Sequence, residues 1–581
     1  MEMEMEKPPA VVAAVMQIII FFEGVVQSPY QFDAILISRT PFRVCQYYYS
    51  GVQNETILDC TTLRPPVRKP RGQHCTRCTQ MTPDETSSLP FHGPPLPHDQ
   101  AHPPRSVSED RALLSRRSAM TALLTGSSVA AWDTAGPALR PADALTYDAT
   151  TWCRRYSALR DDSPPAWCNV GEEEAATVAA ARRYSKWWGL PLAPFENKAT
   201  TRTELVEGSV WGFEQLFGIL DVLVNARMTV VKLEGGGLWV HNTLAPTEEL
   251  KRLLGELEAA HGPVKYLVVG SAAVEHKWCT AAMAEAYPEA EVWVPPNGWS
   301  WPVNGGPLGF SPVGLYPSRV AGVLPISSEG WNPPWGDQIE HEVLGVGGSV
   351  LTGFNRPWFT DCGFYDRRSR TLLVTDVVQS AHSQEPPAVA VVDPYPLLLR
   401  AQSGPGDIRP DTPANRREGW GKTLLFGLLF KPEAVDSELF RREFNLRRGL
   451  RDAYIWDKEL YEATLATITD PILFVPPIAE VLGVPRRPTE IDAWARKVAK
   501  WDFKQIVPGH LDAPIAAGPY EFLATVSSAI NSAPLGPFNP KDLFVVRTLE
   551  QYSVAAKTLQ PSRLEHYDRG QLDAALDGFK R

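Results

Sequence analysis

Two side chains that could do chemistry together, Glu275 and His276, lie within the segment Pro263–Pro296. The apolar run Tyr266–Val269 has the length and composition of a buried strand, and a turn of small residues separates it from the pair. A helix-like stretch and a second strand, Glu291–Val294, come after the pair. This order predicts a β-α-β unit, which places reactive side chains at the carboxyl end of a strand.

A carboxylate beside an imidazole offers the donor atoms of a metal site, and this is the chemistry that Glu275 and His276 could supply. A structural interpretation stands beside it. The helix after the pair is expected to begin near Lys277, and an acidic side chain is favourable at the amino end of a helix. The pair therefore consists either of ligands or of polar residues at a helix start.

The elements before this unit are predicted from periodicity and turn chemistry. Apolar residues spaced by three and four predict a helix over Asn197–Asn225. Two β-rich runs, Met228–Leu233 and Leu238–His241, flank three glycines, which is the pattern of a hairpin. Thr247 and the acids after it predict the capped start of a helix over Glu248–Ala260.

The elements after this unit include a second hairpin. The runs Cys362–Tyr365 and Thr371–Thr375 predict its two strands, and Asp376 follows directly. Apolar spacing then predicts an amphipathic helix over Ile491–Trp501, and the sequence FKQIV predicts a strand that leads into Pro-Gly-His at His510.

Three further stretches carry weaker patterns. Asn297–Gly336 is rich in Gly, Pro and Trp and is predicted to be a covering loop. Asp337–Leu344 fits either a helix or a strand, and Gln379–Gly419 is predicted to be an irregular insertion.

The length and composition of the chain exclude several functional classes. A chain of 581 residues is too long for one ordinary domain, and its 44% apolar content can bury a sizeable core. The net charge of −10 and the lack of a basic stripe interleaved with aromatics argue against a nucleic-acid partner. The best apolar run, Ala10–Phe22, is shorter than the roughly 18 residues that a transmembrane segment needs.

The first 146 residues are predicted to be a disordered targeting leader. Thr61–Ser118 is rich in Pro and polar residues and cannot bury enough apolar surface to order itself. Within 106–144, the pair Arg116 and Arg117, an apolar run and a small-x-small end resemble a twin-arginine signal. An ordinary transit peptide with a chance arginine pair is the alternative. The expected localisation is the plastid, with the thylakoid lumen favoured over the stroma.

The eight cysteines are scattered without the spacing of a disulfide framework. The single CxxC motif, Cys75 to Cys78, has no second pair, and a structural zinc site needs four ligands. We therefore expect two incidental thiols there.

The order of these elements resembles the metallo-β-lactamase-like superfamily, an α/β fold in which two sheets form an αββα sandwich. Several blocks, among them RMTVVKLEGGGLWVHN, EHKWC and FKQIVPGHLDAPI, look like a family of plants, algae and cyanobacteria known as domain of unknown function 4336. The resemblance implies a domain over 147–559 with a core at about 207–551, Trp/Pro-rich loop insertions and a tail at 560–581.

The resemblance also implies where metal ligands would lie. The superfamily's dinuclear site uses the motif THxHxDH, a middle histidine, a bridging aspartate and a late histidine. Here the motif falls on Gly270–His276, with Ser271 and Ala273 in place of its two leading histidines. No histidine occurs near Phe359–Gly363, where the middle one would fall. The first metal position is therefore expected to be empty.

The second metal position keeps a full set of donors: Glu275, His276, Asp376 and His510. Two imidazoles and two carboxylates suit one divalent zinc, iron or manganese ion. This retained donor set supports the hypothesis of a mononuclear metal-dependent hydrolase that acts on a small ester, lactone or thioester in the plastid, where the leader is expected to direct it.

The alternative is a sandwich domain without catalysis or metal, whose degenerate site leaves it a module that binds a small molecule or a protein. Its Trp-rich loops would carry the binding surface, although tryptophans more often pack loops onto a core. The tryptophans concerned are Trp299, Trp301, Trp331, Trp335 and Trp358.

Overall fold

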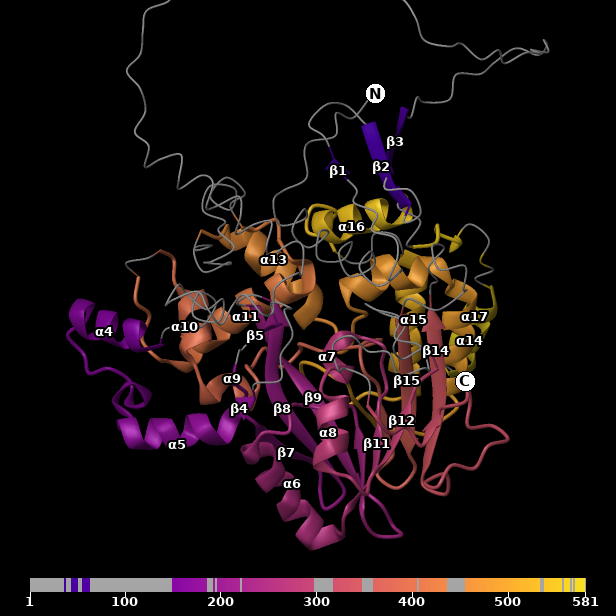
Figure 1. The fold of residues 1–581 in the computed structure, drawn as a ribbon, viewed down its shortest axis with the longest axis horizontal. Helices are drawn as coiled ribbons and strands as arrows, with labels where there is room; N and C mark the ends of the chain where they lie inside the picture. The colour runs from indigo at the N-terminus through magenta and orange to yellow at the C-terminus, as the bar shows by residue number, and fades with distance from the viewer. Residues whose placement is uncertain are drawn as a thin grey trace, which may run out of the picture. The chain divides into compact units, whose positions relative to one another are not determined.

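Two units of the chain, Gly24–Ala138 and the unit that contains Leu139–Arg581, are distinguished in the computed structural model (Figure 1). The described residues are 36–37, 43–50, 55–62, 149–184, 192–193, 196–219, 222–296, 317–346, 359–404, 407–435, 455–532, 538–555, 559–564, 567 and 570–579.

The smaller unit contains antiparallel strands β1 (Leu36–Ile37), β2 (Arg43–Ser50) and β3 (Glu55–Thr62). These strands fall within the segment predicted to be a disordered leader. The rest of that leader, including 106–144 and the CxxC motif, lies outside the described residues.

The larger sheet of the second unit has the strand order β13-β12-β11-β10-β9-β8-β5, with β7 also paired to β8. The predicted hairpin around the three glycines is confirmed, because β9 and β10 pair antiparallel with Trp239 opposite Val231. Strands β11 and β12 add in parallel, as a β-α-β unit requires. The strands are β5 (Leu192–Ala193), β7 (Thr201–Val206), β8 (Val210–Ile219), β9 (Val222–Lys232), β10 (Leu238–His241), β11 (Val264–Val268), β12 (Glu291–Val294) and β13 (Gly322–Val323).

The helix predicted over Asn197–Asn225 is wrong, since this stretch forms β7, β8 and the start of β9. Its apolar residues fall at helical spacing, but β8 is buried on both faces, so apolar and polar positions do not alternate along it. Its aromatic residues, Trp211, Phe213 and Phe217, are typical of strands. Because β8 is buried on both faces, its sequence lacks the alternation of apolar and polar residues that predicts a strand.

The smaller sheet has the order β14-β15-β16-β17. The ambiguous stretch Asp337–Leu344 lies mostly in a strand, and the second predicted hairpin is confirmed by the antiparallel pairing of β15 with β16. Strand β17 pairs in parallel with β16, so their carboxyl ends lie at one edge. The strands are β14 (Ile339–Val346), β15 (Phe359–Asp366), β16 (Thr371–Leu373) and β17 (Gln505–Val507).

The two sheets share an apolar core that joins Val231, Trp239 and Val268 of the larger sheet to Phe364 and Val507 of the smaller one. Helices cover the outer faces of both sheets (Figure 1). On the larger sheet these are α6 (Glu248–His261) and α8 (Thr280–Ala286), and on the smaller sheet α14 (Pro488–Val498) and α15 (Pro519–Ser532). The predicted αββα sandwich is confirmed.

The start of α6 is the capped one that the sequence predicts. The Thr247 side chain accepts a hydrogen bond from the backbone N–H of Leu250, and Glu248 and Glu249 lie in the first turn. Leu250, Leu254 and Leu257 then form the buried face of this helix.

The insertion Gln379–Gly419, predicted to be irregular, contains α9 (Ala388–Val392), α10 (Tyr395–Ala401) and the start of α11 (Pro413–Leu429). The prediction is wrong because α9 and α10 are short and nearly all apolar, so they show no amphipathic period. The remaining elements are β4 (Arg183–Tyr184), β6 (Glu196–Asn197), α5 (Glu172–Arg182), α13 (Lys458–Thr469), η2 (Ala479–Gly483), η3 (Val484–Arg486), α16 (Phe544–Ala555) and α17 (Gly570–Phe579), the last within the predicted tail.

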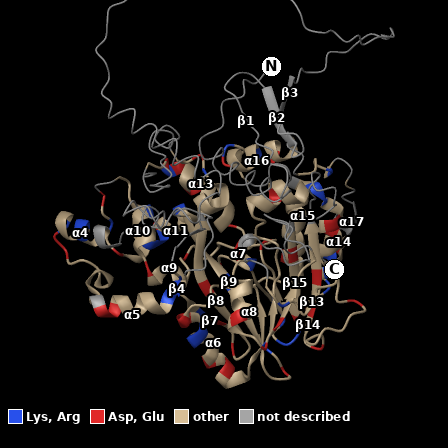
Figure 2. Cartoon of the chain, viewed as in Figure 1, with Lys and Arg blue, Asp and Glu red and all other residues tan. Residues whose placement is uncertain are grey.

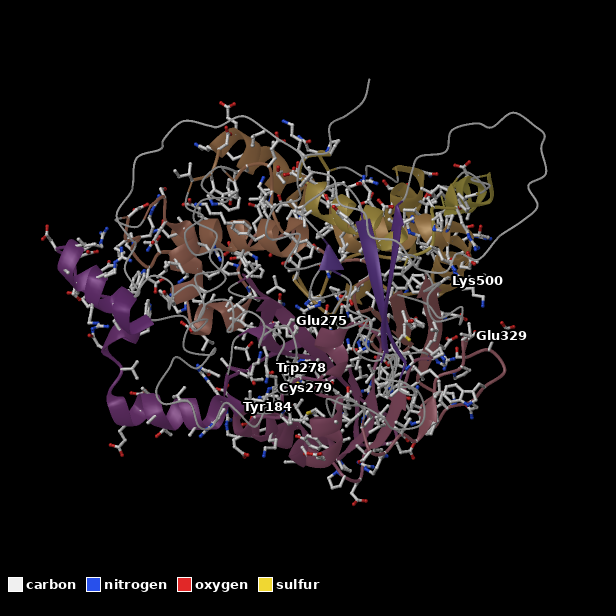
Figure 3. The ribbon with its side chains drawn as sticks, turned by 45° about the horizontal axis from the view of Figure 1, so that its top comes forward. Tyr184, Glu275, Trp278, Cys279, Glu329 and Lys500 are labelled. Atoms are coloured by element: carbon white, nitrogen blue, oxygen red, sulfur yellow. A yellow bond between two sulfur atoms is a disulfide. The ribbon has the colours of Figure 1, made fainter. Side chains whose placement is uncertain are left out.

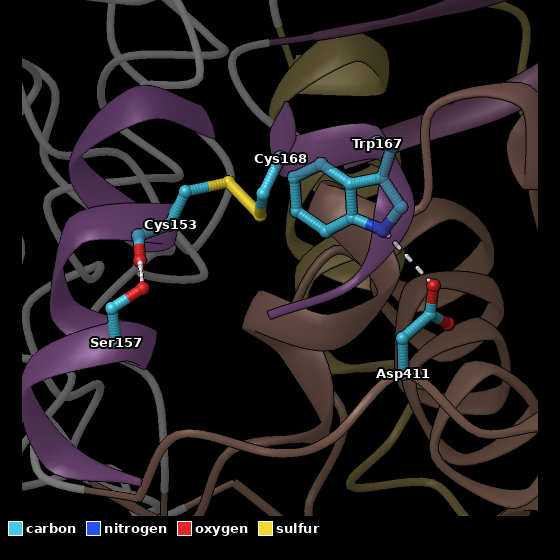
Figure 4. Close-up of a disulfide and its surroundings, with 5 residues drawn as sticks. All are labelled: Cys153, Ser157, Trp167, Cys168 and Asp411. Atoms are coloured by element: carbon cyan, nitrogen blue, oxygen red, sulfur yellow. Dashed lines mark hydrogen bonds between the residues drawn. A yellow bond between two sulfur atoms is a disulfide. The ribbon is translucent and has the colours of Figure 1, made fainter. Parts of the chain in front are cut away.

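A disulfide joins Cys153 of α4 (Ala149–Leu159) to Cys168 of the short helix η1 (Ala166–Asn169) (Figure 4). The indole N–H of Trp167 donates to Asp411 at 2.9 Å. The spacing of the cysteines does not predict this pairing, because Cys153 and Cys168 are brought together by the turn between α4 and η1.

Two of the tryptophans proposed for a binding surface pack against the core between the sheets, Trp335 fully buried and Trp331 half-buried. Trp335 is 1% exposed, and Trp331 lies against the ring of Trp293 with centroids 5.4 Å apart. The other three lie outside the described residues.

Acidic and basic residues are interspersed over the described elements (Figure 2). Among the described residues, no helix is both long and apolar enough to cross a membrane.

Candidate metal centre

Three segments from the two sheets meet at one point. Glu275 and His276 lie on α7 (Val274–Lys277), which follows β11, whereas Asp376 follows β16 and His510 follows β17. One donor atom from each of the four side chains lies within 4.8 Å of the others. The structure therefore brings together all four ligands that the sequence predicts.

The segment that carries Glu275 and His276 is fixed by the core next to it. Figure 3 shows Glu275 on the helix, with Trp278, Cys279 and Tyr184 close together beyond it. The ring of Trp278 meets that of Tyr184 edge to face at 5.5 Å, and Cys279 is fully buried. The helix expected to begin near Lys277 begins earlier, at Val274, and Glu275 lies in its first turn, where an acidic side chain is favourable, as the structural interpretation predicts.

The two imidazoles of the cluster face each other through their Nε2 atoms. These atoms are 2.9 Å apart, and Oδ1 of Asp376 lies 3.5 Å from His276 Nε2 and 3.4 Å from His510 Nε2. Nδ1 of His510 donates to the carbonyl of Asn225 at 2.7 Å, so its Nε2 carries the lone pair in the neutral ring. Two imidazole nitrogens bound at about 2.0–2.1 Å to one zinc ion lie roughly 3 Å apart, so the pair fits one ion.

The charges of the cluster are coupled. Burial raises the pKa of Asp376, but His276 and His510 beside it outweigh burial and hold that pKa below its usual range. Burial lowers the pKa of His510, and the hydrogen bond and charge of Asp376 more than offset it, so the pKa is raised. The aspartate is therefore an anion that attracts positive charge to this point.

Ser271, which replaces a predicted histidine ligand, bonds to the cluster instead. Its hydroxyl donates to Oδ2 of Asp376 at 3.3 Å and accepts the backbone N–H of Ala273 at 3.0 Å. The oxygen of Asp376 that faces away from the imidazoles is thus satisfied by a hydroxyl group.

Asp361 lies on β15, in the stretch where the middle histidine would fall, and is fully buried. Its carboxylate accepts the backbone N–H groups of Thr375 at 3.0 Å, Asp376 at 2.6 Å and Val377 at 2.8 Å. Burial and the Asp376 charge raise the pKa of Asp361, while these three bonds favour its charged form. Asp361 therefore fixes the turn that presents Asp376.

His241, at the end of β10, is a further buried imidazole beside the cluster. Its Nε2 lies 3.4 Å from the hydroxyl of Thr375 and directly over Gly270, where an added Cβ would come within 2.2 Å of it. Burial, helped by the charge of His276, lowers the pKa of His241 to about 3, so the ring is neutral at neutral pH.

This lowered pKa predicts a loss of stability in acid. Unfolded His241 takes up a proton near its ordinary pKa of about 6.5, whereas the folded ring stays neutral down to a pKa of about 3. The unfolded state therefore binds more protons as pH falls through this window, which favours unfolding. In metal-free protein, the fall in unfolding free energy from pH 6.5 to 5 should be smaller in His241→Phe by roughly 2 kcal/mol. Denaturant titrations at the two pH values measure it, and an equal fall in both proteins contradicts it.

Several residues of this site were not predicted from the sequence: Asn225, His241 and Asp361. An acid in the interior of the strand FTDCGFYD, five residues before the aspartate that ends it, was the one available signal for Asp361. Asn225 acts through its backbone carbonyl, which leaves no trace in its residue type.

Comparison with known proteins assigns more than half of the chain to one family. Residues 207–527 match the model described as Domain of unknown function (DUF4336). No curated protein shows significant similarity to the chain.

Solved structures similar to the chain include three bacterial proteins. A metallo-beta-lactamase from Pontibacter korlensis is 11% identical with a TM-score of 0.29, over 56% of this chain and 99% of that one. The metallo-beta-lactamase FIM-1 from Pseudomonas aeruginosa in its mono-zinc form is 11% identical with a TM-score of 0.27, over 58% and 96%. A flavo di-iron protein mutant from Thermotoga maritima is 12% identical with a TM-score of 0.28, over 57% and 62%.

Proposed function

The chain belongs to the family described as Domain of unknown function (DUF4336), a description that names no reaction. From the geometry of the site, we propose that the protein is a mononuclear metal-dependent hydrolase. The observation that carries this proposal is the convergence of Glu275, His276, Asp376 and His510 from three distant segments. The substrate class proposed is a small ester, lactone or thioester.

The donor set fits a divalent ion. Two imidazoles with two carboxylates suit zinc, iron or manganese, and the fixed tautomer of His510 turns its lone pair toward the cluster. Such an ion supplies Lewis acidity toward a carbonyl oxygen and makes a water molecule more acidic.

The surroundings of Asp376 support one ion rather than two. Ser271 occupies Oδ2 of this aspartate with a hydrogen bond, and the Asp361 carboxylate is engaged by three backbone N–H groups. Ala273 has no ligand atom. In the part of the chain that the structure describes, the residues at the first metal position thus either lack a ligand atom or are otherwise bonded.

The four side chains of the cluster differ in their exposure to solvent. His276 and His510 are buried and hold their positions through backbone contacts, whereas Glu275 and Asp376 are partly exposed. A substrate would therefore approach from the carboxylate side, where Glu275 is placed to accept a proton.

Metal analysis of the purified full chain tests the binding. After metal loading and desalting, wild type should retain about one zinc, iron or manganese ion per chain, and His276→Ala and His510→Ala should retain far less. His382→Ala is a matched control, because the His382 ring also bonds a backbone carbonyl, that of Thr469 at 2.8 Å, but lies outside the cluster. Equal metal in all four proteins would refute the site.

Hydrolysis of a panel of 4-nitrophenyl esters, lactones and acyl thioesters tests the reaction. We expect turnover by wild type and by His382→Ala that a chelator removes, and none by the two cluster variants. Stoichiometric metal without turnover of any panel member would reject the hydrolase and favour a binding module.

We further propose that the chain works in the plastid and, within it, in the oxidising thylakoid lumen. The disulfide Cys153–Cys168 supports this, because disulfides persist in oxidising compartments and are rare where thiols are kept reduced. After import of the full chain into isolated chloroplasts, we expect recovery in the lumen with this disulfide formed. Recovery in the stroma with both thiols free is the contrary result.

The disulfide itself is expected to stabilise the segment it closes. Its partners are 15 residues apart in sequence, and a loop of this size is worth roughly 3 kcal/mol in the chain-entropy account. Cys153→Ser should therefore expose the α4–η1 segment to proteolysis at lower denaturant concentration than in wild type. Cys279→Ser, at a buried free cysteine, should leave the cleavage pattern of this segment unchanged.

A further inference from the structure

Resting on the metal binding proposed above, we propose that Arg227, with Asn225, is the positioning device for His510. Arg227 contributes no atom to the metal cluster. It acts on the loop Pro508–Leu511, which carries the histidine, and so sets the affinity of the site for its ion.

Arg227 binds every carbonyl of this loop. Its backbone N–H donates to Gly509 at 2.7 Å, and its Nη1 donates to Pro508 at 2.6 Å and to His510 at 3.3 Å. Its Nη2 donates to the carbonyl of Leu511. One residue of β9 therefore fixes four successive peptide groups that lie more than 280 positions away in the chain.

The guanidinium is buried and its charge is matched. Its side chain is 3% exposed, and Nη2 also lies 2.5 Å from Oε1 of Glu214, which is 8% exposed. Asn225 donates to the same carboxylate oxygen at 2.8 Å. A planar fork with several donors can serve these acceptors together, which a single ammonium group cannot.

Asn225 holds the end of the loop. Its Oδ1 accepts the N–H of Leu511 at 3.0 Å and its Nδ2 donates to the carbonyl of Leu511 at 3.1 Å, while its own carbonyl accepts Nδ1 of His510. Leu511 has φ +55°, a left-handed conformation that a leucine adopts only when its surroundings impose it. Arg227 and Asn225, which together form a clamp on this loop, therefore support a strained turn directly after His510.

The consequence for the site is specific. The bond from Nδ1 to Asn225 keeps the proton of the neutral His510 ring on Nδ1 and leaves Nε2 as the donor atom. Outer partners of this kind typically change metal affinity by about 10- to 100-fold when they are removed. Loss of the clamp should therefore weaken metal binding while the rest of the cluster remains.

The test compares Arg227→Lys and Asn225→Ala with wild type in the full chain. Zinc affinity is measured by chelator competition, and the ¹⁵N signals of His510 are recorded in metal-free protein. We expect zinc affinity to fall by about 10- to 100-fold in Arg227→Lys and less in Asn225→Ala, with loss of the single Nδ1-protonated tautomer in Arg227→Lys.

Arg486→Lys is the matched control. Arg486 is 0% exposed and pairs with Glu550, but it lies outside the metal cluster and its supports, so its variant should keep wild-type zinc affinity and His510 signals at a comparable cost in stability.

The outcomes separate the two proposals. Absence of zinc, iron and manganese binding by wild type would refute the proposed function, and the His510 signals of the metal-free proteins would still test the clamp. Unchanged affinity and unchanged His510 signals in folded Arg227→Lys would overturn the clamp. If Arg227→Lys does not fold, wild-type values for both readouts in Asn225→Ala would overturn it.

Discussion

Asp361→Ala is expected to lower the free energy of unfolding by about 3 kcal/mol or more and to reduce metal retention sharply, since three backbone N–H donors would lose their shared acceptor. The Asp361 carboxylate is the acceptor of the N–H groups of residues 375, 376 and 377, and it is fully buried. Alanine cannot accept these bonds and leaves a space that would have to admit water. The turn that presents Asp376 would then no longer hold one conformation.

A second aspartate on the same strand provides the control. Asp366 is also fully buried, and it likewise accepts a backbone N–H of a turn, that of Ser369 at 3.1 Å, and the side chain of Gln338 at 2.9 Å. Asp366→Ala should lose stability comparably but keep wild-type metal affinity, because it lies at the other end of β15. Denaturant titration gives the stabilities, and chelator competition gives the affinities.

Two results would contradict this account of Asp361. One is a folded Asp361→Ala protein with wild-type metal affinity. The other is an equal loss of affinity in Asp361→Ala and Asp366→Ala, which would mean that any damage to β15 disturbs the site.

Trp239→Ala is expected to destabilise the sandwich by about 3–5 kcal/mol, the usual cost of removing a large buried aromatic side chain. Trp239 is fully buried between the two sheets. Its ring centroid lies 5.1 Å from that of Phe364 on the opposite sheet, 6.3 Å from Trp335 and 6.1 Å from His241. Its loss leaves a cavity that these neighbours cannot fill without moving.

Equilibrium unfolding in urea measures this effect. Trp239→Phe, which keeps an aromatic ring, should cost clearly less than alanine. Trp501→Ala should also cost less, because Trp501 is only partly buried and packs beside Tyr365 on the outer face of the smaller sheet. A Trp239→Ala protein as stable as wild type would show that the two sheets do not depend on this contact.

Local patterns predicted most of the strands of the two sheets and their order along the chain. Hairpin glycines, the Thr247 cap and short apolar runs each act over a few residues, so the sequence shows them directly. The helix prediction over Asn197–Asn225 was wrong because β8 is buried on both faces. A helix and a strand buried on both faces can show the same apolar pattern. The prediction that the insertion at 379–419 is irregular was wrong because its short apolar helices have no polar face, so the sequence shows no helical period there.

The sequence predicted the four candidate metal ligands but not the residues that hold them in place. Glu275 and His276 stand out locally, and Asp376 and His510 followed from the resemblance to a superfamily motif. Arg227 and Asp361 support the site through bonds to backbone groups of distant segments, and such bonds do not depend on the residue types of their partners. Their roles become visible only when the chain is folded.

The most direct test of the central claim is the anomalous scattering of crystals of the full chain loaded with zinc or manganese. We predict one anomalous peak per chain, bounded by Nε2 of His276, Nε2 of His510 and Oδ1 of Asp376, with Glu275 beside it. No peak at this point, or two peaks sharing Asp376, would contradict a mononuclear metal centre.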